Sequence, residues 1–381
     1  MKPLQGLRVL DFSRILAGPL ATMWMADLGA EVVKVERPGN GDETRRWGPP
    51  FVGGQSAYFL AVNRGKYGLG LDLGQPQVRP VLEHLVRQSD VVVHNFLPQT
   101  AEKLGLDYPQ VKAINPKVVY VAVAGFPPGP YRDEPGFDAL IQAVGGLMAI
   151  TGEEEQPVKV GVAIVDVLTA WAALCGTLAA LLVREKTGQG QAVEATLVEC
   201  SAAALVNVSQ AFLLTGKEPR RLGTAHPHIV PYQAFPAADG LLMVAVGTDA
   251  QFQALCQAIG RPELAQDPRF ATNPERVQHR DLLVSVLSEV FGAQPRSFWI
   301  SRLKEVNVPA GPVNSFAELF GDPGLVGRIL IEVEHPTVGR YKTVACPVSS
   351  AWPPSPLPPP LLGEHTNAIL ARLGIPSLKG G

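Results

Sequence analysis

The sequence predicts an α/β protein with a Rossmann-like parallel sheet in a large domain and a smaller α+β domain beside it. The chain has 381 residues, and at about 150 residues per domain that length predicts two or three domains. Apolar strand-like runs alternate with helix-like segments over the first 125 residues. The composition, 46% hydrophobic and 18% charged, is typical of a compact protein with a large core rather than a disordered chain.

The first elements follow one another at short intervals. Leu7–Phe12 is expected to form a short buried strand. Leu20–Leu28 is expected to form a helix, introduced by Gly18 and Pro19, because proline is tolerated at an early helical position. Glu31–Glu36 is expected to form the next strand, ended by Arg37, Pro38 and Gly39.

The same alternation continues along the chain. A helix is expected over residues 77–87, a strand over 90–95, a second short helix, and a strand over 118–123. Strands that alternate with helices indicate right-handed βαβ units and a parallel sheet, in which ligands bind beyond the carboxyl ends of the strands. The loops at 13–18, 37–46 and 95–98 are therefore the expected places for ligand contacts.

A long apolar helix follows a strand-like run at residues 160–165. Its apolar part, Val167–Val183, is near the lower limit of length for crossing a bilayer and contains many Ala, Thr and Gly residues. We interpret it as a buried helix of a protein that does not enter the membrane.

The pattern changes after a polar segment around residues 217–221, which indicates a domain boundary. Two strands near Gly240 are followed by three helices, strand and turn signals appear at 331–348, and a proline-rich run, 353–360, reads as an extended connector. The predicted divisions are a large Rossmann-like domain at 1–200, a linker at 201–221, a small domain at 222–315 and a C-terminal segment at 316–381.

Composition and motifs exclude several function classes. The chain has a formal net charge of -2. It therefore lacks the excess of basic residues that nucleic-acid binding requires. The turn after the first strand carries no G-x-G-x-x-G, and the chain has no P-loop motif. The four cysteines are far apart in sequence, so neither a zinc site nor a disulfide framework is expected. The widely spaced cysteines indicate a reducing compartment, and the N-terminal residues do not resemble a signal peptide. Together these two observations predict a cytoplasmic protein.

Asp166 lies between the strand-like run and the apolar helix, and two interpretations stay open for it. Aspartate is a preferred residue at a helix N-terminus, where it caps the first turn. The other interpretation is a nucleophile at the edge of a buried helix, where exclusion of water would protect a reactive acyl intermediate.

Two further clusters are candidates for ligand contacts. His226 and His228 form an H-x-H pair, but no acidic or cysteine partner is spaced to complete a metal site, so no metal is expected. Arg37, Arg45 and Arg46 follow the second strand, a position that suits a phosphate-bearing ligand.

Several segments in family order resemble the class III, formyl-CoA transferase-like family of CoA-transferases. They extend from residue 6 to residue 370, so the resemblance covers nearly the whole chain. The matching segments are Gly6–Phe12, Ala17–Pro19, Asp27–Gly39, Asn63–Lys66, Asp90–Phe96, Lys186–Gln191, Val308–Val313 and Leu361–Thr366. Residues 42–53, 223–226, 229–235 and 334–339 look most like the branch that acts on dicarboxylates.

The resemblance implies roles for particular residues. It implies that Asp166 is the catalytic aspartate, with coenzyme A as part of the substrate and no permanently bound cofactor. The CoA-contacting positions of the family fall on Ile15, Leu16, Ala17, Arg37, Leu71, Asn95, Phe96, Lys103 and Leu104. A basic contact of some members falls on Gly74, so phosphate recognition is expected to depend on Arg37 and Lys103. The acid-binding candidates are Arg45, Arg46, Phe137, Asp138, His226, His228 and Tyr232.

The resemblance also implies a reaction and an assembly. Succinyl-CoA is the expected donor and a dicarboxylate such as glutarate the expected acceptor, through an aspartyl covalent intermediate. Similar proteins are homodimers of two interlocked chains, in which the C-terminal segment returns to the large domain. Two alternatives stay open: an α-methylacyl-CoA racemase, which would need an acid–base residue where this chain has Phe137, and a non-catalytic CoA-binding protein.

Overall fold

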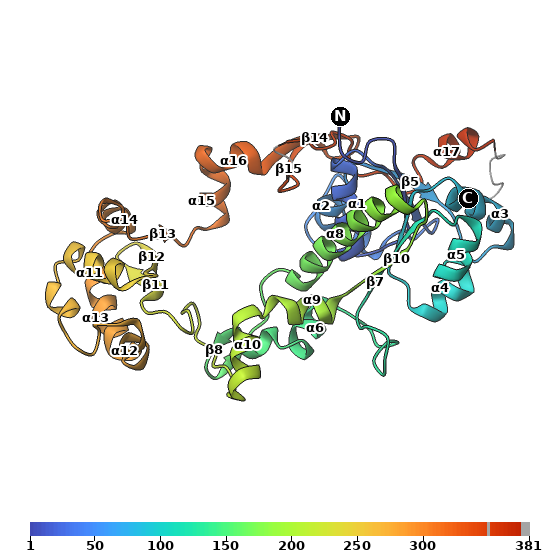
Figure 1. Ribbon diagram of the computed structural model, residues 1–381. Helices are drawn as coiled ribbons and strands as arrows, with labels where there is room; N and C mark the ends of the chain where they lie inside the picture. Colours follow the sequence, from blue (N-terminus) through green and yellow to red (C-terminus); the bar gives the residue numbers. More distant parts are fainter. Residues whose placement is uncertain (349–350, 375–381) are drawn as a thin grey trace. The chain divides into compact units, whose positions relative to one another are not determined.

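The computed structural model describes residues 1–348 and 351–374, and the chain divides into two compact units (Figure 1). The first unit contains residues 1–147, 159–215 and the C-terminal residues from 327 onward. The second contains residues 148–158 and 216–326, and the predicted small domain at 222–315 lies within it. Residues 206–215, which we placed in a linker, form a helix of the first unit.

A six-stranded sheet forms the centre of the first unit. All its strand pairs are parallel, in the order β10-β7-β6-β1-β2-β5. The strands are β1 (Arg8–Asp11), β2 (Glu31–Glu36), β5 (Lys66–Gly70), β6 (Val91–His94), β7 (Val119–Ala124) and β10 (Ala192–Thr196). Counted along the chain the order is 6-5-4-1-2-3, the doubly wound order, and it reverses between β1 and β6. The predicted parallel sheet is confirmed.

Both faces of this sheet are buried, because successive strand side chains point to opposite faces. Val91 and Val93 of β6 pack with helices α1 (Ala17–Asp27) and α8 (Ile164–Thr187) in one apolar cluster. Val92, between them, belongs to a second cluster with α3 (Arg79–Arg87) and the C-terminal helix α17 (Thr366–Arg372). A strand of consecutive valines is what such two-sided burial requires.

Helix α8 begins earlier than the sequence pattern indicates. The expected strand over 160–165 is wrong: Gly161 and Val162 form a bend, and the helix begins at Ile164. Val162 is 53% exposed and Val160 N donates to Gln142 Oε1 at 2.8 Å, so this apolar run does not pair with the sheet. The helix is long and apolar enough to span a membrane by length and composition, and 44% of its most apolar stretch is buried.

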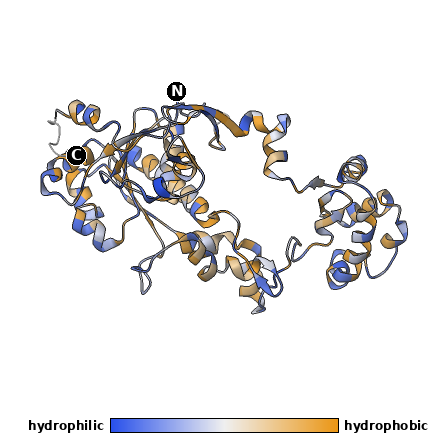
Figure 2. Cartoon of the chain, turned by 180° about the vertical axis from the view of Figure 1, so that it is seen from behind, coloured by the Kyte–Doolittle hydropathy of each residue, from blue (hydrophilic) through white to orange (hydrophobic). Residues whose placement is uncertain are grey.

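The remaining helices of the first unit connect or cover the strands. They are η1 (Glu43–Arg46), α2 (Ala57–Val62), η2 (Pro76–Val78), α4 (Pro98–Leu104), α5 (Tyr108–Ile114), α6 (Asp138–Val144), α9 (Leu197–Ala204) and α10 (Val206–Thr215). Helix α7 (Leu147–Ile150) begins in the first unit and ends in the second. Two short strands, β3 (Phe51–Val52) and β4 (Gln55–Ser56), form a hairpin. Helices α9 and α10 are mainly apolar (Figure 2), yet Val206, Leu213 and Leu214 on α10 are more than 60% exposed.

The second unit has its own core around a three-stranded antiparallel sheet. The strands are β11 (Tyr232–Ala237), β12 (Gly240–Ala245) and β13 (Ala310–Pro312), and residues 152–157 form the hairpin β8 (Gly152–Glu153) and β9 (Gln156–Pro157). Phe235, Phe252, Phe291 and Trp299 dominate its core. The helices are η3 (Pro262–Ala265), α11 (Asp249–Ala258), α12 (Asn273–Gln278), α13 (Arg280–Gly292), α14 (Arg296–Glu305) and α15 (Phe316–Gly321). Helix α16 (Pro323–Ile329) leads back to the first unit.

The C-terminal segment returns to the sheet of the large domain. After the hairpin β14 (Leu330–His335) and β15 (Gly339–Val344), the chain reaches the edge strand β5. There Gly68 N donates to His365 Nδ1 at 3.1 Å and Gly70 N to Thr366 Oγ1 at 2.9 Å. These bonds satisfy backbone groups of an edge strand that would otherwise be unpaired.

Candidate functional site

A hollow of about 360 Å³ lies at the carboxyl ends of β1 and β6, where the strand order reverses. This is the position at which doubly wound sheets bind ligands. The loops after β1 and β6, two of the three that the sequence indicated, contribute Ile15, Leu16, Ala17, Asn95 and Phe96 to its lining. Asp166 lines the same hollow, so the structure brings the predicted nucleophile together with five of the predicted CoA contacts.

Asp166 is the third residue of α8, and it does not cap the helix. The N-cap residue is Ala163, which provides no side-chain hydrogen bond. Asp138 Oδ1 instead accepts hydrogen bonds from Val165 N at 2.8 Å and Asp166 N at 3.3 Å. The capping interpretation of Asp166 is therefore wrong, because a carboxylate from α6 satisfies the first amides of the helix and leaves Asp166 free for chemistry.

Burial and the neighbouring carboxylate of Asp138 raise the pKa of Asp166 to about 7. Asp138 itself is held in place, since Gln142 Nε2 donates to its Oδ2 at 2.6 Å. A carboxylate of raised pKa is more basic and a better nucleophile when ionised. The arrangement thus presents one reactive carboxylate, Asp166, beside one fixed carboxylate, Asp138.

Two aromatic residues complete the surroundings of Asp166. Burial and the charges of Asp166 and Asp138 raise the pKa of Tyr58 to about 12, which keeps its phenol protonated. Phe137 lines the hollow with Asp166 and is 58% exposed. Its side chain has no titratable group, so it cannot act as the second acid–base residue that racemisation requires.

The loop between β1 and α1 is held in a strained conformation. Ile15 has a φ of 72°, which is rare for a β-branched residue. The side chain of Asn95 holds both backbone groups of Arg14, the residue before Ile15. Arg14 N donates to Asn95 Oδ1 at 3.0 Å, and Asn95 Nδ2 donates to Arg14 O at 2.8 Å. Ile15 N donates to Asp42 at 3.2 Å. Such strain is maintained only where the surroundings determine the backbone firmly, which is common at functional sites.

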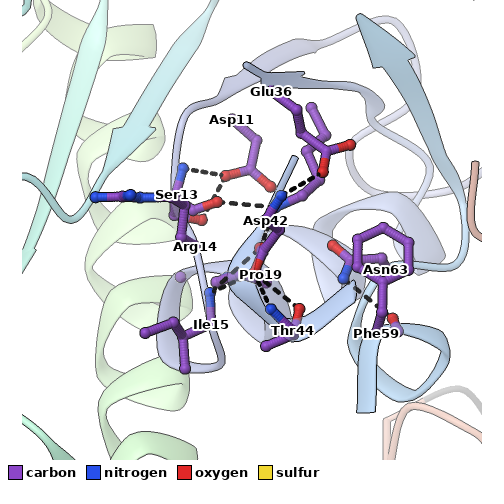
Figure 3. Close-up of polar contacts among 12 residues, drawn as sticks. Asp11, Ser13, Arg14, Ile15, Pro19, Glu36, Asp42, Thr44, Phe59 and Asn63 are labelled. Atoms are coloured by element: carbon purple, nitrogen blue, oxygen red, sulfur yellow. Dashed lines mark hydrogen bonds and ion pairs between the residues drawn. The ribbon is translucent and has the colours of Figure 1, made fainter. Parts of the chain in front are cut away.

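A buried network of charges supports this loop (Figure 3). Lys34 Nζ pairs with Asp42 at 2.9 Å and donates to Ser13 O at 2.8 Å, and Lys66 Nζ pairs with Asp11 at 3.0 Å. All four charged side chains are fully buried. Although burial opposes ionisation, Lys66 and Lys34 hold the pKa of Asp11 below its usual value, and burial lowers the pKa of Lys66 to about 8.

A second hollow of about 470 Å³ adjoins the first, because Arg14, Glu43 and Phe96 line both. It contains three more of the predicted CoA contacts, Arg37, Leu71 and Leu104, together with Gly74 and Arg46. Lys103 is exposed on α4 and lines neither hollow. Sequence reasoning missed Arg14, Glu43, Trp47 and Arg132 in the first hollow.

The two arginines predicted to bind the acid, Arg45 and Arg46, lie outside the hollow that contains Asp166. Arg45 is bound to Glu36 by two hydrogen bonds of 2.7 and 2.8 Å and to Pro360 O at 3.1 Å, so its guanidinium is occupied. Arg46 donates to Asn40 O at 2.8 Å and lines the second hollow. Neither lines the hollow of Asp166.

His226, His228 and Tyr232 lie in the second unit. There His226 N donates to Tyr232 O at 2.9 Å, His228 N donates to His226 Nδ1 at 3.1 Å, and the rings of His226 and Tyr232 stack at 5.3 Å. Burial, with the nearby charges of His228 and Arg280, lowers the pKa of His226. Over residues 1–348 and 351–374, no group of three or more His, Cys, Asp or Glu residues is arranged to hold a metal ion.

Comparison with known proteins gives consistent matches over almost the whole chain. A family model described as CoA-transferase family III matches residues 4–366. The chain is 41% identical over 378 residues to succinyl-CoA:glutarate CoA-transferase of Mus musculus, which covers 98% of this chain and 87% of the mouse protein. It is 40% identical over 384 residues to succinate–glutarate CoA-transferase of Agrobacterium fabrum, which covers 97% of this chain and 96% of that protein.

A solved structure shares the fold. The crystal structure of a CAIB/BAIF family protein from Brucella suis superimposes with a TM-score of 0.86 at 41% sequence identity. The superposition covers 98% of this chain and 99% of the other. The match therefore includes both units and the C-terminal return.

Proposed function

The chain belongs to CoA-transferase family III, and from that premise we propose that it transfers CoA from succinyl-CoA to a free dicarboxylate, with glutarate as the first acceptor to test. Two relatives at about 40% identity carry names that specify this exchange. The single observation that carries the proposal is the position of Asp166. Its carboxylate has a raised pKa and lines the hollow formed by the loops expected to contact CoA.

The exchange can proceed through acyl groups carried by Asp166. Its carboxylate attacks the thioester carbonyl of succinyl-CoA, which forms a mixed anhydride and releases the CoA thiolate. The thiolate attacks the aspartyl carbonyl of the anhydride, which releases succinate and leaves an aspartyl-CoA thioester. The acceptor carboxylate then attacks this thioester, and the thiolate released in that step attacks the acceptor's acyl carbonyl. The products are the new acyl-CoA and free Asp166 carboxylate.

This sequence needs no external energy source, because one carboxylic thioester replaces another of similar energy. The basicity of Asp166 suits the first step, since a carboxylate with a pKa near 7 is a stronger nucleophile than an exposed one. The fixed carboxylate of Asp138 disfavours a second negative charge at Asp166. The charge of Asp166 is removed when the aspartyl acyl group forms, so this repulsion favours acylation.

The two adjoining hollows give CoA a path to Asp166. The nucleotide end would occupy the second hollow near Arg37, Leu71 and Leu104, and the pantetheine arm would pass Phe96 into the first. Arg37 is well placed for a phosphate, because its side chain is 68% exposed and its nearest carboxylate, Asp72, is 3.9 Å away. Lys103 would contribute only if CoA extends beyond the hollow onto α4.

We also propose that the protein acts as an interlocked homodimer in the cytoplasm. The exposed apolar residues of α10, Val206, Leu213 and Leu214, would be covered by the second copy. The four cysteines are free, which suits a reducing compartment.

The test of the activity is direct. Purified protein is mixed with succinyl-CoA and, one at a time, with free dicarboxylates, without ATP or added metal, and the acyl-CoA products are separated by chromatography. A new acyl-CoA that forms at the expense of succinyl-CoA, and that disappears in Asp166→Ala, supports the proposal. Absence of exchange with every acid would overturn the proposed donor and acceptor class.

A further inference from the structure

A dicarboxylate acceptor must bring its second negative charge into a hollow that already contains carboxylates. Asp166 and Glu43 line this hollow, and Asp138 lies beside Asp166. A carboxylate removed from water without a partner loses several kcal/mol of hydration free energy. The distal carboxylate of the acceptor therefore needs a cation with free hydrogen-bond donors close to Asp166.

Two arginines, Arg14 and Arg132, line the hollow. Arg132 is occupied by the protein itself: Nη1 donates to Phe126 O at 2.8 Å, and Nη2 is ion-paired with Glu194. Both terminal nitrogens of Arg132 thus already have acceptors. Arg45 and Arg46, the arginines expected from the sequence, lie outside this hollow.

Arg14 differs from Arg132 in the donors that it leaves free. Its Nη1 donates to Glu43 Oε1 at 2.8 Å, and no hydrogen bond to the described residues is formed by Nε or Nη2. The side chain is 45% exposed, and its guanidinium carbon lies 5.6 Å from the centre of the Phe96 ring. Nε and Nη2 form one edge of the guanidinium, which matches the two oxygens of a carboxylate.

The main chain of Arg14 is rigid, so the guanidinium is presented from a fixed base. Both its N–H and its carbonyl are bonded to the Asn95 side chain, and the strained Ile15 that follows is held by Asp42. Glu43 orients the side chain from the other side. A site that is organised before binding loses less conformational entropy when the ligand arrives.

We propose that Arg14 binds the distal carboxylate of the acceptor acid and thereby makes the enzyme select dicarboxylates over monocarboxylates. The inference rests on the proposed function and specifies which residue determines the acid. It requires the acceptor's reacting carboxylate at Asp166 and its distal carboxylate on the free edge of Arg14. Arg14 lies between the two hollows, so the competing role is a contact with the pantetheine arm of CoA.

The experiment compares glutarate with glutaramate, which has the same chain length but an uncharged amide in place of one carboxylate. The kcat/KM for each acceptor is measured at saturating succinyl-CoA for wild type, Arg14→Gln, Arg14→Lys and the control Arg87→Gln. Arg87 is an exposed arginine on α3 that lines neither hollow. The dissociation constant of free CoA is measured for each variant.

Arg14→Gln is expected to lower kcat/KM for glutarate by about tenfold to a hundredfold, the effect of one charged hydrogen-bonded contact. The value for glutaramate is expected to change less than about threefold, and the affinity for CoA to stay unchanged. Arg14→Lys keeps the charge but loses the planar fork, so its loss for glutarate should be intermediate. It also keeps the proposal testable if Arg14→Gln folds poorly.

Equal losses for glutarate and glutaramate, or weaker binding of free CoA, would overturn the inference and assign Arg14 to CoA. Wild-type protein that transfers CoA to no acid would instead overturn the proposed function itself. The two failures are distinguishable, because the first requires an active wild-type enzyme.

Discussion

Asp138 Oδ1 accepts a hydrogen bond from the backbone N–H of Asp166 at 3.3 Å. The carboxylate at the start of α6 therefore caps the helix that carries Asp166, the proposed nucleophile, and its charge lies close to the carboxyl group of Asp166. Burial is the main reason for the raised pKa of Asp166, and the charge of Asp138 adds to it. One residue thus contributes both to the position and to the basicity of Asp166.

The first prediction concerns pH. Because the ionised form of Asp166 is the proposed nucleophile and its pKa is about 7, kcat/KM should increase with pH up to about 7 and then level off. Asp138→Asn keeps an oxygen for the α8 amides but removes the charge, so the acidic limb of the pH profile should move to lower pH. The profile of each variant, with thermal unfolding to verify folding, measures this.

Asp133→Asn is the matched control for this experiment, because Asp133 is exposed, precedes α6 and does not line the hollow. Its pH profile should coincide with that of wild type. An acidic limb that stays in place in Asp138→Asn would show that the charge of Asp138 does not affect the nucleophile.

The second prediction concerns the stability effect of Asp166 itself. Its pKa is about 7 in the folded protein and 3.8 in the absence of perturbation, so the unfolded chain releases this proton at lower pH than the folded one. The stabilisation associated with the protonated form is present below pH 4 and is lost as the pH rises through 7. At pH 8 the free energy of unfolding of Asp166→Asn should therefore exceed that of wild type by on the order of 1 kcal/mol, and the variant should unfold at a higher temperature.

This gain should become small near pH 4, and it should accompany a loss of transfer activity of at least about a thousandfold, as expected when a covalent nucleophile is removed. Affinity for CoA should be retained. Calorimetry at pH 4 and pH 8, together with single-turnover assays, measures both effects. A variant that is less stable than wild type at pH 8 would contradict the assignment of Asp166 as an electrostatically unfavourable residue.

The third prediction concerns the buried network. Asp42 accepts from Lys34, Thr44 and the strained Ile15. Asp42→Asn leaves the fully buried ammonium of Lys34 without its carboxylate, which typically costs about 3 to 5 kcal/mol. Urea unfolding should show this loss, and the variant should also bind CoA more weakly because the loop at Ile15 is released.

The paired variant Lys34→Met with Asp42→Asn removes both charges and is the control. It should recover part of the stability, because replacing a whole buried ion pair is much less costly than breaking it. If the double variant is as unstable as Asp42→Asn, the loss arises from the other bonds of Asp42 and not from the charge of Lys34.

Strands β5 (KYGLG) and β10 (AVEAT) contain no long apolar run and were not expected from the sequence. The other four strands of the sheet could be predicted because each contains a run of apolar residues between helices, as in Val91–Val93. The start of α8 could not. Residues 160–165 have the same apolar character as a buried strand, and only the bonds to Asp138 and Gln142 make them a bend that leads into a helix. Periodicity does not report such tertiary contacts.

Asp166 was singled out through the family resemblance, because the residue itself left both a helix cap and a nucleophile open. Arg14 was missed because its partners lie 29 and 81 residues away, at Glu43 and Asn95. The buried network did leave a signal: Lys34 lies between Val33 and Val35 in the middle of a strand, which implies a buried partner for its charge. The sequence does not specify which carboxylate pairs with it.

The last prediction separates Arg45 from Arg14. Arg45 forms an ion pair with the buried Glu36, and its guanidinium carbon lies 3.7 Å from the centre of the Phe59 ring. It also donates a hydrogen bond to Pro360 O in the C-terminal segment. Its side chain is 12% exposed, so Arg45→Gln should lower the free energy of unfolding by about 3 kcal/mol or more. The neighbouring Arg46→Gln, which loses one exposed hydrogen bond, should lower the free energy of unfolding by less than about 1 kcal/mol.

The activity that remains in Arg45→Gln should keep the wild-type ratio of kcat/KM for glutarate to that for glutaramate, because Arg45 is outside the hollow of Asp166. A changed ratio would show that Arg45 reaches the acid, and urea unfolding with the two-acceptor assay decides between these outcomes.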